Sequence, residues 1–445
     1  MKWIIFFINF ITKNNMKKIL AFVFILTSLT AYSQLLHLKS MRYFSGDLNS
    51  PLVNVFDVNK ESLIKSINCG ETVVNSRLCF NKEETKIYKI GLRYASVIDV
   101  ATLEAEKIKL LSDEDTLVQN TTKLMAMIEA ERNRVLKEIE NSNLDAKFTE
   151  TPEIIKMKAL PLLIISLGVS ESGIVVSERL FTDKIELNVY DLKQAGKKVN
   201  TFDLPAGSDC TMHEGNILVF VQDGSINIVD PITGKNIGKI GNAIDAKDLA
   251  EAKIVTAGYD NKNIRVNLSS YGKYLITSLN LGMIPNTATI KKAFSIYNFA
   301  TKTIVYSSRG IENSPSIMPI YGTELFQKVV AKTPMPVLQL PEPPDFTKYT
   351  AKDIKNGTMT KASVDYEEKV KTSQAEWKLK FDAYNNPQNF ATKIYSDINA
   401  TQELLSIDAA RYVGIKGDYI ICLKDLGIEF YDLKTKSLVH TIYNL

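Results

Sequence analysis

Histidine and cysteine are scarce in this sequence, and their spacing offers little chemistry. The 445 residues contain three histidines, His37, His213 and His440, and four cysteines. Cys210 and His213 lie three residues apart in the segment CTMH, but no second pair of ligands accompanies them. Because a zinc site needs three or four protein ligands, we expect these two residues to be structural and the chain to hold no metal.

The motifs that position catalytic groups or phosphates are also missing. The sequence has no HExxH, GxSxG, GxxxxGK[ST], GxGxxG or DxDxDG segment. Asp245 and Asp248, in DAKD, fit a solvated loop or the start of a helix better than an acid pair. The sequence therefore names no catalytic residue and no cofactor.

The N-terminal segment has the organisation of a signal peptide. Met16-Lys17-Lys18 precedes an apolar run from Ile19 to Ala31, and the small residues Ala31 and Ser33 stand before Gln34. We expect cleavage after residue 33, with residues 1–15 as an upstream extension and 34–445 as the mature chain. An uncleaved anchor is the alternative, but a membrane-spanning helix needs about 20 apolar residues.

The MKK opening and AYSQ ending of this segment resemble those of exported proteins of the Bacteroidetes. The resemblance implies a periplasmic or secreted protein, with no membrane span once the signal is removed. Export also permits disulfides. Cys69 and Cys79 flank a short segment, so a Cys69–Cys79 disulfide and two buried thiols are both open.

The net charge belongs to the same segment. The chain has 54 Lys and Arg against 50 Asp and Glu, and the excess corresponds to Lys2, Lys13, Lys17 and Lys18, with no acid before residue 34. The predicted mature chain is formally neutral, and its basic clusters are short. We therefore expect no nucleic-acid partner.

One pattern recurs six times along the chain. Each copy reads apolar-x-apolar-apolar, then Asp or Asn, then a polar turn and a second strand-like run. The copies are 53–67, 95–110, 187–204, 226–240, 294–308 and 428–442, with Asp57, Asp99, Asp191, Asp230, Asn298 and Asp432 at the turn. Alternating apolar residues favour a β-hairpin, and an Asp or Asn side chain at the turn entry accepts a backbone N–H. We interpret these six residues as turn formers rather than catalytic groups.

The repeat predicts an all-β protein, a β-propeller with two helical insertions. Turn residues are separated by 42, 92, 39, 68 and 134 residues, and the short intervals match the ~40-residue blade of WD-repeat proteins. The organisation resembles the WD-repeat and YVTN-type β-propeller superfamily, although the Trp-Asp and Gly-His signatures are absent. With a weak seventh candidate at 315–332, we expect seven blades, with six or eight as alternatives.

Two segments interrupt the β pattern. Residues 112–150 carry an apolar stripe at helical spacing, and residues 334–400 open with a proline-rich linker followed by a second such stripe. We select the second stripe as the candidate partner surface: Tyr366, Val370, Trp377, Phe381 and Tyr384. Packing of either stripe on the propeller is the alternative. Each interruption is expected to follow the second strand of a hairpin, which would place both helices on one propeller face.

The leading functional hypothesis is an exported propeller that serves as a binding or scaffolding module of the cell envelope. Its partner would be another envelope protein or a small ligand at the propeller face. The alternative is a propeller hydrolase or lyase with carboxylates and tyrosines at the channel mouth, which would require such side chains to converge in one pocket.

Overall fold

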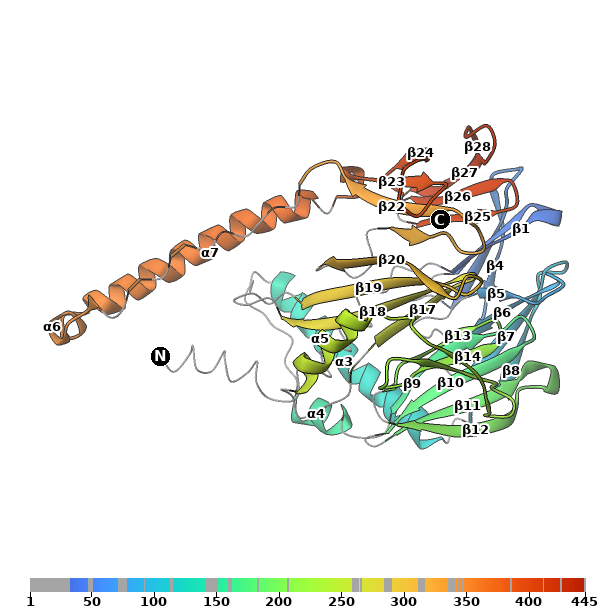
Figure 1. Cartoon of the computed structure of the whole chain (residues 1–445), viewed down its shortest axis with the longest axis horizontal. Coiled ribbons are helices and arrows are strands. Elements are labelled where there is room, and N and C mark those ends of the chain that lie inside the picture. The colour runs from blue at the N-terminus through green and yellow to red at the C-terminus, as the bar shows by residue number, and fades with distance from the viewer. Residues whose placement is uncertain are drawn as a thin grey trace. The chain divides into compact units, whose positions relative to one another are not determined.

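In a computed structural model, the described residues form seven four-stranded antiparallel sheets and five helices of five or more residues (Figure 1). The description covers residues 33–443 except 47–50, 71–77, 92, 113–114, 141–150, 159–161, 182–183, 206–207, 258–263, 265, 284–289, 311–316, 335, 337–338, 340, 343, 346–347, 385, 411 and 425. The predicted signal peptide, save Ser33, lies outside it. No helix of the described part is long and apolar enough to cross a membrane.

The chain divides into two compact units, Met1–Pro315 and Ser316–Leu445. The first holds sheets A to E. Sheet A is β1 (Ser33–His37), β2 (Arg42–Gly46), β3 (Leu52–Asp57) and β4 (Ser62–Asn68); sheet B is β5 (Leu78–Phe80), β6 (Lys86–Ile90), β7 (Tyr94–Asp99) and β8 (Ala105–Lys109). Sheet C is β9 (Leu162–Val169), β10 (Ile174–Leu180), β11 (Lys184–Asp191) and β12 (Lys197–Pro205). Sheet D is β13 (Cys210–His213), β14 (Asn216–Phe220), β15 (Ile226–Val229) and β16 (Asn236–Ile240); sheet E is β17 (Val266–Tyr271), β18 (Tyr274–Met283), β19 (Ile290–Asn298) and β20 (Thr303–Gly310).

The second unit holds sheets F and G. Sheet F is β21 (Met318–Pro319), β22 (Phe326–Ala331), β23 (Phe390–Tyr395) and β24 (Glu403–Asp408). Sheet G is β25 (Tyr412–Lys416), β26 (Tyr419–Lys424), β27 (Gly427–Asp432) and β28 (Leu438–Tyr443). Within each of the seven sheets the strands pair in chain order, which makes the protein a β-propeller of seven blades.

The predicted repeat is the outer hairpin of six sheets, formed by their third and fourth strands. The side-chain oxygen of each of the six turn residues accepts a hydrogen bond from the backbone N–H of a residue two or three positions later. The pairs are Asp57 with Lys60, Asp99 with Ala101 and Thr102, Asp191 with Lys193, Asp230 with Ile232 and Thr233, Asn298 with Ala300 and Thr301, and Asp432 with Lys434 and Thr435. The residue four positions after each has a positive φ, and Gly234 is the one glycine among the six. A short polar side chain at the entry therefore organises each turn.

The seventh hairpin escaped the sequence pattern. The candidate 315–332 forms β21 and β22, the inner strands of sheet F, and the outer hairpin is β23–β24. Its turn residue is Asp397, which accepts N–H groups from Asn399, Thr401 and Gln402. One extra residue, Ser396, lies between the end of β23 and this Asp. The apolar residues of the strand therefore stand one position further from the turn residue than in the other six hairpins.

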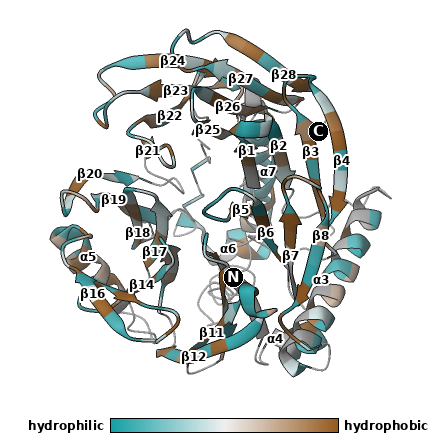
Figure 2. Ribbon diagram, turned by 90° about the vertical axis from the view of Figure 1, so that its right-hand side faces the viewer, coloured by the Kyte–Doolittle hydropathy of each residue, from teal (hydrophilic) through white to brown (hydrophobic). Residues whose placement is uncertain are grey.

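Within each unit, neighbouring sheets pack face to face through apolar side chains. Sheet C shows why: Val175 and Tyr190 join a cluster with sheet B, while Val176 and Val189 join a cluster with sheet D. Successive residues of a strand point to opposite faces, so the middle strands need apolar residues on both. Figure 2 shows the resulting hydrophobic bands along the strands.

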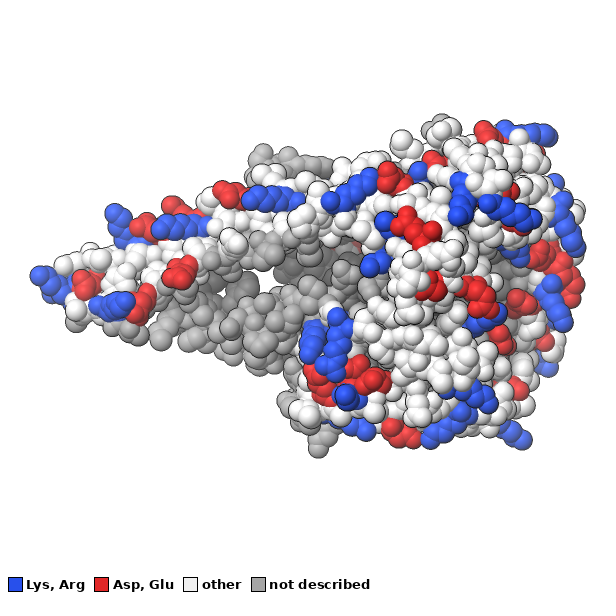
Figure 3. Space-filling model, turned by 45° about the horizontal axis from the view of Figure 1, so that its top comes forward, with Lys and Arg blue, Asp and Glu red and all other residues white. Residues whose placement is uncertain are grey.

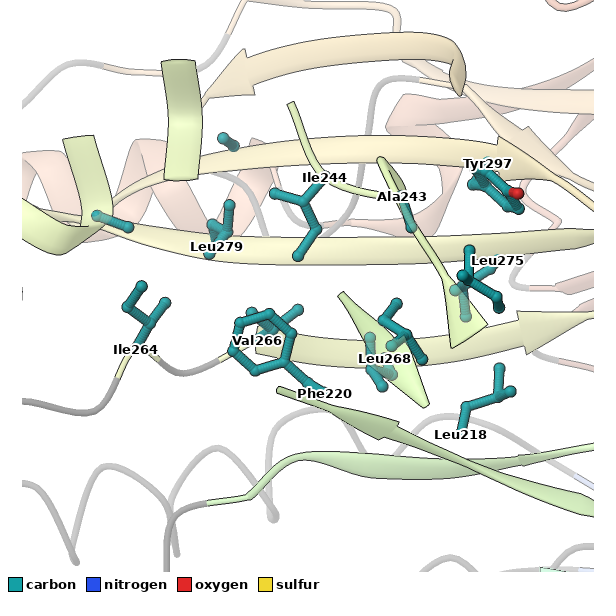
Figure 4. Packing of buried hydrophobic residues seen from close by; sticks show 14 of the residues in the cluster. Leu218, Phe220, Ala243, Ile244, Ile264, Val266, Leu268, Leu275, Leu279 and Tyr297 are labelled. Atoms are coloured by element: carbon teal, nitrogen blue, oxygen red, sulfur yellow. The ribbon is translucent and has the colours of Figure 1, made fainter. Parts of the chain in front are cut away.

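The largest cluster lies between sheets D and E. It includes Phe220, Val266, Leu275 and Tyr297, all buried (Figure 4). Ile226 of β15 belongs to the same cluster. Helix α5 (Ala246–Ala257) adds Ala252, which has no exposed surface. Arg309 of β20 pairs with Asp248 and Glu251 of α5, so Asp248 belongs to a helix held on the sheet rather than to a solvated loop.

The first helical insertion is α3 (Thr116–Glu140) followed by α4 (Pro152–Lys158), between sheets B and C. Leu124 of the predicted stripe is buried against Ile154 of α4, with Ile128 beside it. Arg179 of β10 donates to Asp115, just before α3, at 2.8 Å. This part of α3 therefore packs on α4, and its N-terminal end is tied to sheet C.

The second insertion corrects the expected order of elements. Helices α6 (Ala351–Lys355) and α7 (Thr358–Tyr384) lie between β22 and β23, the second and third strands of sheet F, and not between two blades. Antiparallel strands reverse direction at each connection, so the connection from a second to a third strand leaves a sheet at the same edge as the connection to the next sheet. The prediction that both inserted helices share one face concerns both units and stays a prediction.

The turn role of Asp99 gives a test. Replacing Asp99 with Ala removes hydrogen bonds from Ala101 and from the amide and hydroxyl of Thr102. We expect the free energy of unfolding, measured by urea denaturation at pH 7, to fall by about 1 kcal/mol. Asp99→Asn should keep most of the stability, because its amide oxygen can accept the same hydrogens, as Asn298 does.

At acidic pH, wild type and Asp99→Ala should have the same free energy of unfolding. The hydrogen bonds from Thr102 and Ala101 hold the pKa of Asp99 below its ordinary value of 3.8. A lowered folded-state pKa stabilises the fold above the ordinary pKa, and this contribution disappears as the pH falls through the folded value. If the free energies of unfolding of wild type and Asp99→Ala differ as much at strongly acidic pH as at pH 7, the carboxylate of Asp99 is not the group that stabilises the turn.

Candidate interaction arm

The insertion between β22 and β23, residues 332–389, forms an arm on sheet F. Its two ends meet, because Ala331 pairs with Phe390 in the β22–β23 ladder. Helix α7 extends away from the sheet, with α6 at its far end (Figure 1). At 1.5 Å per residue, the 27 residues of α7 span about 40 Å.

A series of aromatic contacts connects α7 to the sheet. The rings of Trp377 and Phe381 stack with centroids 4.6 Å apart, and those of Phe381 and Tyr384 follow at 6.4 Å. Tyr384 meets Phe390, the first residue of β23, edge to face at 5.2 Å. These four residues are called the aromatic ladder below. Aromatic pairs in such geometries add stability beyond the area they bury.

Polar contacts fix the same end of the arm. The indole Nε1 of Trp377 donates to the Pro336 carbonyl at 3.0 Å, which joins α7 to the proline-rich linker. Asn389 donates to the Tyr384 carbonyl and accepts from the amide and hydroxyl of Thr333. The base of the arm is therefore held by side chains from both of its ends.

The far end of the arm has its own closing contact. Thr350 caps α6, and the Asp353 carboxylate accepts the Thr350 amide and hydroxyl in return. These hydrogen bonds from Thr350 lower the pKa of Asp353. A reciprocal capping box satisfies amide groups at the start of a helix that would otherwise lack partners.

The predicted partner surface, Tyr366, Val370, Trp377, Phe381 and Tyr384, is half-buried throughout. Its last three residues belong to the aromatic ladder or its linker contact. A role of this stripe in binding a partner stays a prediction. The sequence identified the spacing of this stripe but not which side of the helix it would occupy in the fold.

The outward face of α7 carries exposed apolar side chains that sequence reasoning missed. Leu379 is 73% exposed and Val364 48% exposed, and Ile354 of α6 is 57% exposed. Figure 3 shows Lys, Asp and Glu side chains of both signs interspersed along the arm. Leu379 lies two residues beyond Trp377, which places it on the opposite side of a helix. This position relative to the aromatic stripe is the one signal in the sequence that could have indicated its exposure.

The structure separates Cys69 from Cys79, and both are free thiols. Cys69 packs in the cluster between sheets A and B, together with Leu78 and Phe80 of β5. Because side chains alternate along a strand, Cys79 points to the opposite face of β5. The disulfide alternative is thereby corrected: the two sulfurs lie on different sides of a strand.

Cys210 and His213 share β13 but not a site. The Cys210 thiol donates to Glu178 of β10 at 2.9 Å, towards sheet C. His213 stacks on Phe299 at 4.0 Å and bonds Ser270 of β17, towards sheet E. Among the described residues, no group of three or more His, Cys, Asp or Glu side chains is placed to hold a metal ion.

Glu178 of β10 is a half-buried carboxyl group that accepts a hydrogen bond from the Cys210 thiol of sheet D. Burial raises its pKa to about 7, the Cys210 thiol lowers it in part, and the nearby Asp209 charge raises it further. A group of this kind costs stability when it ionises without a cation beside it.

Replacing Glu178 with Gln should stabilise the protein in a pH-dependent way. The folded pKa lies above the ordinary value of 4.5, so the wild type loses stability as the pH rises from about 4.5 to about 7, while the variant does not. We expect similar unfolding free energies at pH 4.5 and an advantage of about 1 to 3 kcal/mol for Glu178→Gln at pH 8. A difference independent of pH in denaturant titrations would contradict this.

The aromatic ladder predicts a local effect of Phe381→Ala. The variant loses the contacts to both Trp377 and Tyr384, so we expect α7 to exchange its amide hydrogens faster while sheet G keeps wild-type rates. Trp377 is the sole tryptophan after residue 3, so its fluorescence should shift to the red. Val364→Ala is the control, because its exposed side chain lies outside the ladder. Unchanged exchange in α7 would show that the ladder does not hold the arm.

Comparisons with known proteins concern the fold. No protein-family model matches the sequence, and no curated protein matches it. Among solved structures, BamB from Moraxella catarrhalis is similar, with 9% identity over 93% of this chain and 87% of that chain and a TM-score of 0.37. Sqt1 from Saccharomyces cerevisiae is similar with 8% identity over 93% of this chain and 84% of that chain and a TM-score of 0.40.

Proposed function

We propose that this protein is an exported β-propeller that binds another protein of the cell envelope, and that the arm presents the recognition surface. The propeller supplies a rigid frame, and the arm is its largest departure from four-stranded sheets. The outward face of α7 carries the proposal, because Leu379 and Val364 are exposed there. On the other side of the helix, Trp377 and Phe381 are engaged in the aromatic ladder and the linker contact.

Three features support a binding role for this face. Apolar side chains surrounded by charges of both signs resemble the composition of protein interfaces, where a few apolar residues contribute most of the affinity. The base is held by side chains from both ends of the arm, so docking would not first require α7 to be ordered on the sheet. Mixed charges also favour a protein partner over a uniformly charged polymer.

Export rests on the signal-peptide pattern before Gln34 and is part of the proposal. Strand β1 begins at Ser33, the last residue before the predicted cleavage site. The hydrolase or lyase with carboxylates and tyrosines at the channel mouth stays an alternative prediction.

The proposal is tested by Leu379→Glu in an affinity-tagged full-length chain, crosslinked in intact cells of its native host and captured from the envelope. A charge in the centre of an apolar contact should reduce the recovered partner by about tenfold or more, since each 1.4 kcal/mol of lost binding is a factor of ten. Leu426→Glu is the matched control, because Leu426 is a leucine between β26 and β27, away from the arm, with 78% exposure.

Equal recovery of partners by Leu379→Glu, Leu426→Glu and wild type would overturn the arm as the recognition surface. A chain found in the cytoplasm with residues 1–33 still attached would overturn export independently, by mass spectrometry of its N-terminus.

A further inference from the structure

The charged side chains of α7 are not used within the chain. The helix carries five lysines and five acidic residues, so its net charge is zero. Among the residues that the structure describes, none of these ten side chains forms an ion pair. The nearest pairs along the chain are Lys348 with Asp345 before the helix and Lys393 with Glu403 after it. The charges of the helix are therefore available to another molecule.

The outward face of α7 combines these charges with the exposed apolar side chains. At about 100° per residue, it lies opposite Trp377 and Phe381. Its residues are all exposed and fall within about 60° of one another around the helix axis. They are Lys361, Val364, Glu368, Ala375, Leu379 and Asp382. Lys371 and Thr372, also exposed, flank the middle of this face.

The order of residues on this face matches its own reverse. Val364 and Leu379 are equally far from the point between positions 371 and 372, and so are Lys361 and Asp382. When the helix is turned end for end about that point, an apolar residue takes the place of an apolar residue, and an anion takes the place of a cation. A surface with this arrangement is complementary to a second copy of itself, as a two-fold interface requires.

We propose that a second copy of this chain docks on the outward face of α7, with the two helices side by side and antiparallel. This rests on the proposed function, in which that face recognises a protein, and it names a second copy as that protein. Val364 of each copy meets Leu379 of the other, and Lys361 of each copy meets Asp382 of the other. The interface thus holds two apolar contacts and two ion pairs.

The middle of the interface also suits this pairing. Glu368 of one copy lies opposite Ala375 of the other, where the small side chain leaves room for the longer one. Lys371 of both copies comes near the two-fold axis, and Glu368 of both copies lies within about one helical turn of it, so the opposite charges alternate there. Two lysines at the axis are therefore compensated by two carboxylates.

The shape of the arm permits the antiparallel arrangement. Helix α7 extends away from sheet F (Figure 1), and its 27 residues span about 40 Å. Two such helices packed antiparallel, at about 8 to 10 Å between axes, keep the sheet F of each copy at opposite ends of the pair. Because only two apolar contacts are buried, we expect a reversible dimer rather than a permanent one.

Sedimentation velocity of the purified full-length protein, from about 1 to about 100 µM, tests the dimer. The wild type should pass from monomer to dimer over this range. Leu379→Glu enters the interface twice, once in each copy, and should raise the dissociation constant by about tenfold or more. Leu426→Glu is the matched control and should dimerise as the wild type does, because Leu426 is an exposed leucine away from the arm.

A charge exchange tests which residues meet. Lys361→Asp alone or Asp382→Lys alone places like charges opposite each other, and each should raise the dissociation constant by about fivefold or more. The two substitutions together restore opposite charges and should return the constant to within about threefold of the wild type. Such a recovery cannot come from misfolding, since the double variant carries both changes.

Disulfide formation tests the antiparallel direction. Val364→Cys and Leu379→Cys, mixed and oxidised, should form a disulfide-linked dimer that neither variant forms alone. In the antiparallel pair, the two copies of position 364 lie about 22 Å apart, beyond the reach of a disulfide. The wild type under the same conditions shows what its own four cysteines contribute.

Three results would each overturn the second copy as the occupant. These are a wild type that stays monomeric to about 100 µM, a dimer that Leu379→Glu leaves unchanged, and a double charge variant no better than the single ones. If the purified chain stays monomeric while envelope capture recovers a different protein that Leu379→Glu loses, this proposal fails and the binding role of the arm stands.

Discussion

Each blade of this protein depends on burying apolar side chains on the faces that it turns to its neighbours. Sheet C does so with Val175 and Tyr190 on one side and with Val176 and Val189 on the other. A four-stranded sheet with two apolar faces has no stable existence alone in water, so its stability comes from adjacent sheets. The outer strands, which meet solvent, are free to carry charged and polar residues.

This constraint decides where specific features can be built. The faces between blades are occupied by packing, and polar groups placed there lose solvent: Lys89 is buried and Glu178 is half-buried. Their chemistry is altered by burial rather than used on solutes. Connections at the edges of the sheets carry no such restriction, and they hold α3, α4, α5 and the arm. The arm is stabilised by its own aromatic ladder, which leaves the outward face of α7 available.

The sequence predicted the hairpins well because their determinants are local. An Asp or Asn at the turn entry and alternating apolar residues lie within a few positions of each other, as around Asp99 and Asp432. The outer hairpin of sheet F did not match the repeat for the same reason. Ser396 adds one residue between β23 and Asp397, and the arm separates β22 from β23 in the sequence. The sequence left the start of helix α5 as one of two alternatives at Asp245 and Asp248, because the residue that holds the helix on its sheet, Arg309, lies far along the chain.

By itself the sequence determined the repeat, the turn chemistry, the helical character of both insertions and the absence of known catalytic motifs, since each is written in residues close together in the chain. Tertiary structure alone decided three things. Trp377, Phe381 and Tyr384 contact one another, their own sheet and the linker. Cys79 points away from the cluster that holds Cys69, and Leu379 faces solvent. These outcomes depend on which face of a helix or strand meets which neighbour, and local pattern does not specify the neighbour.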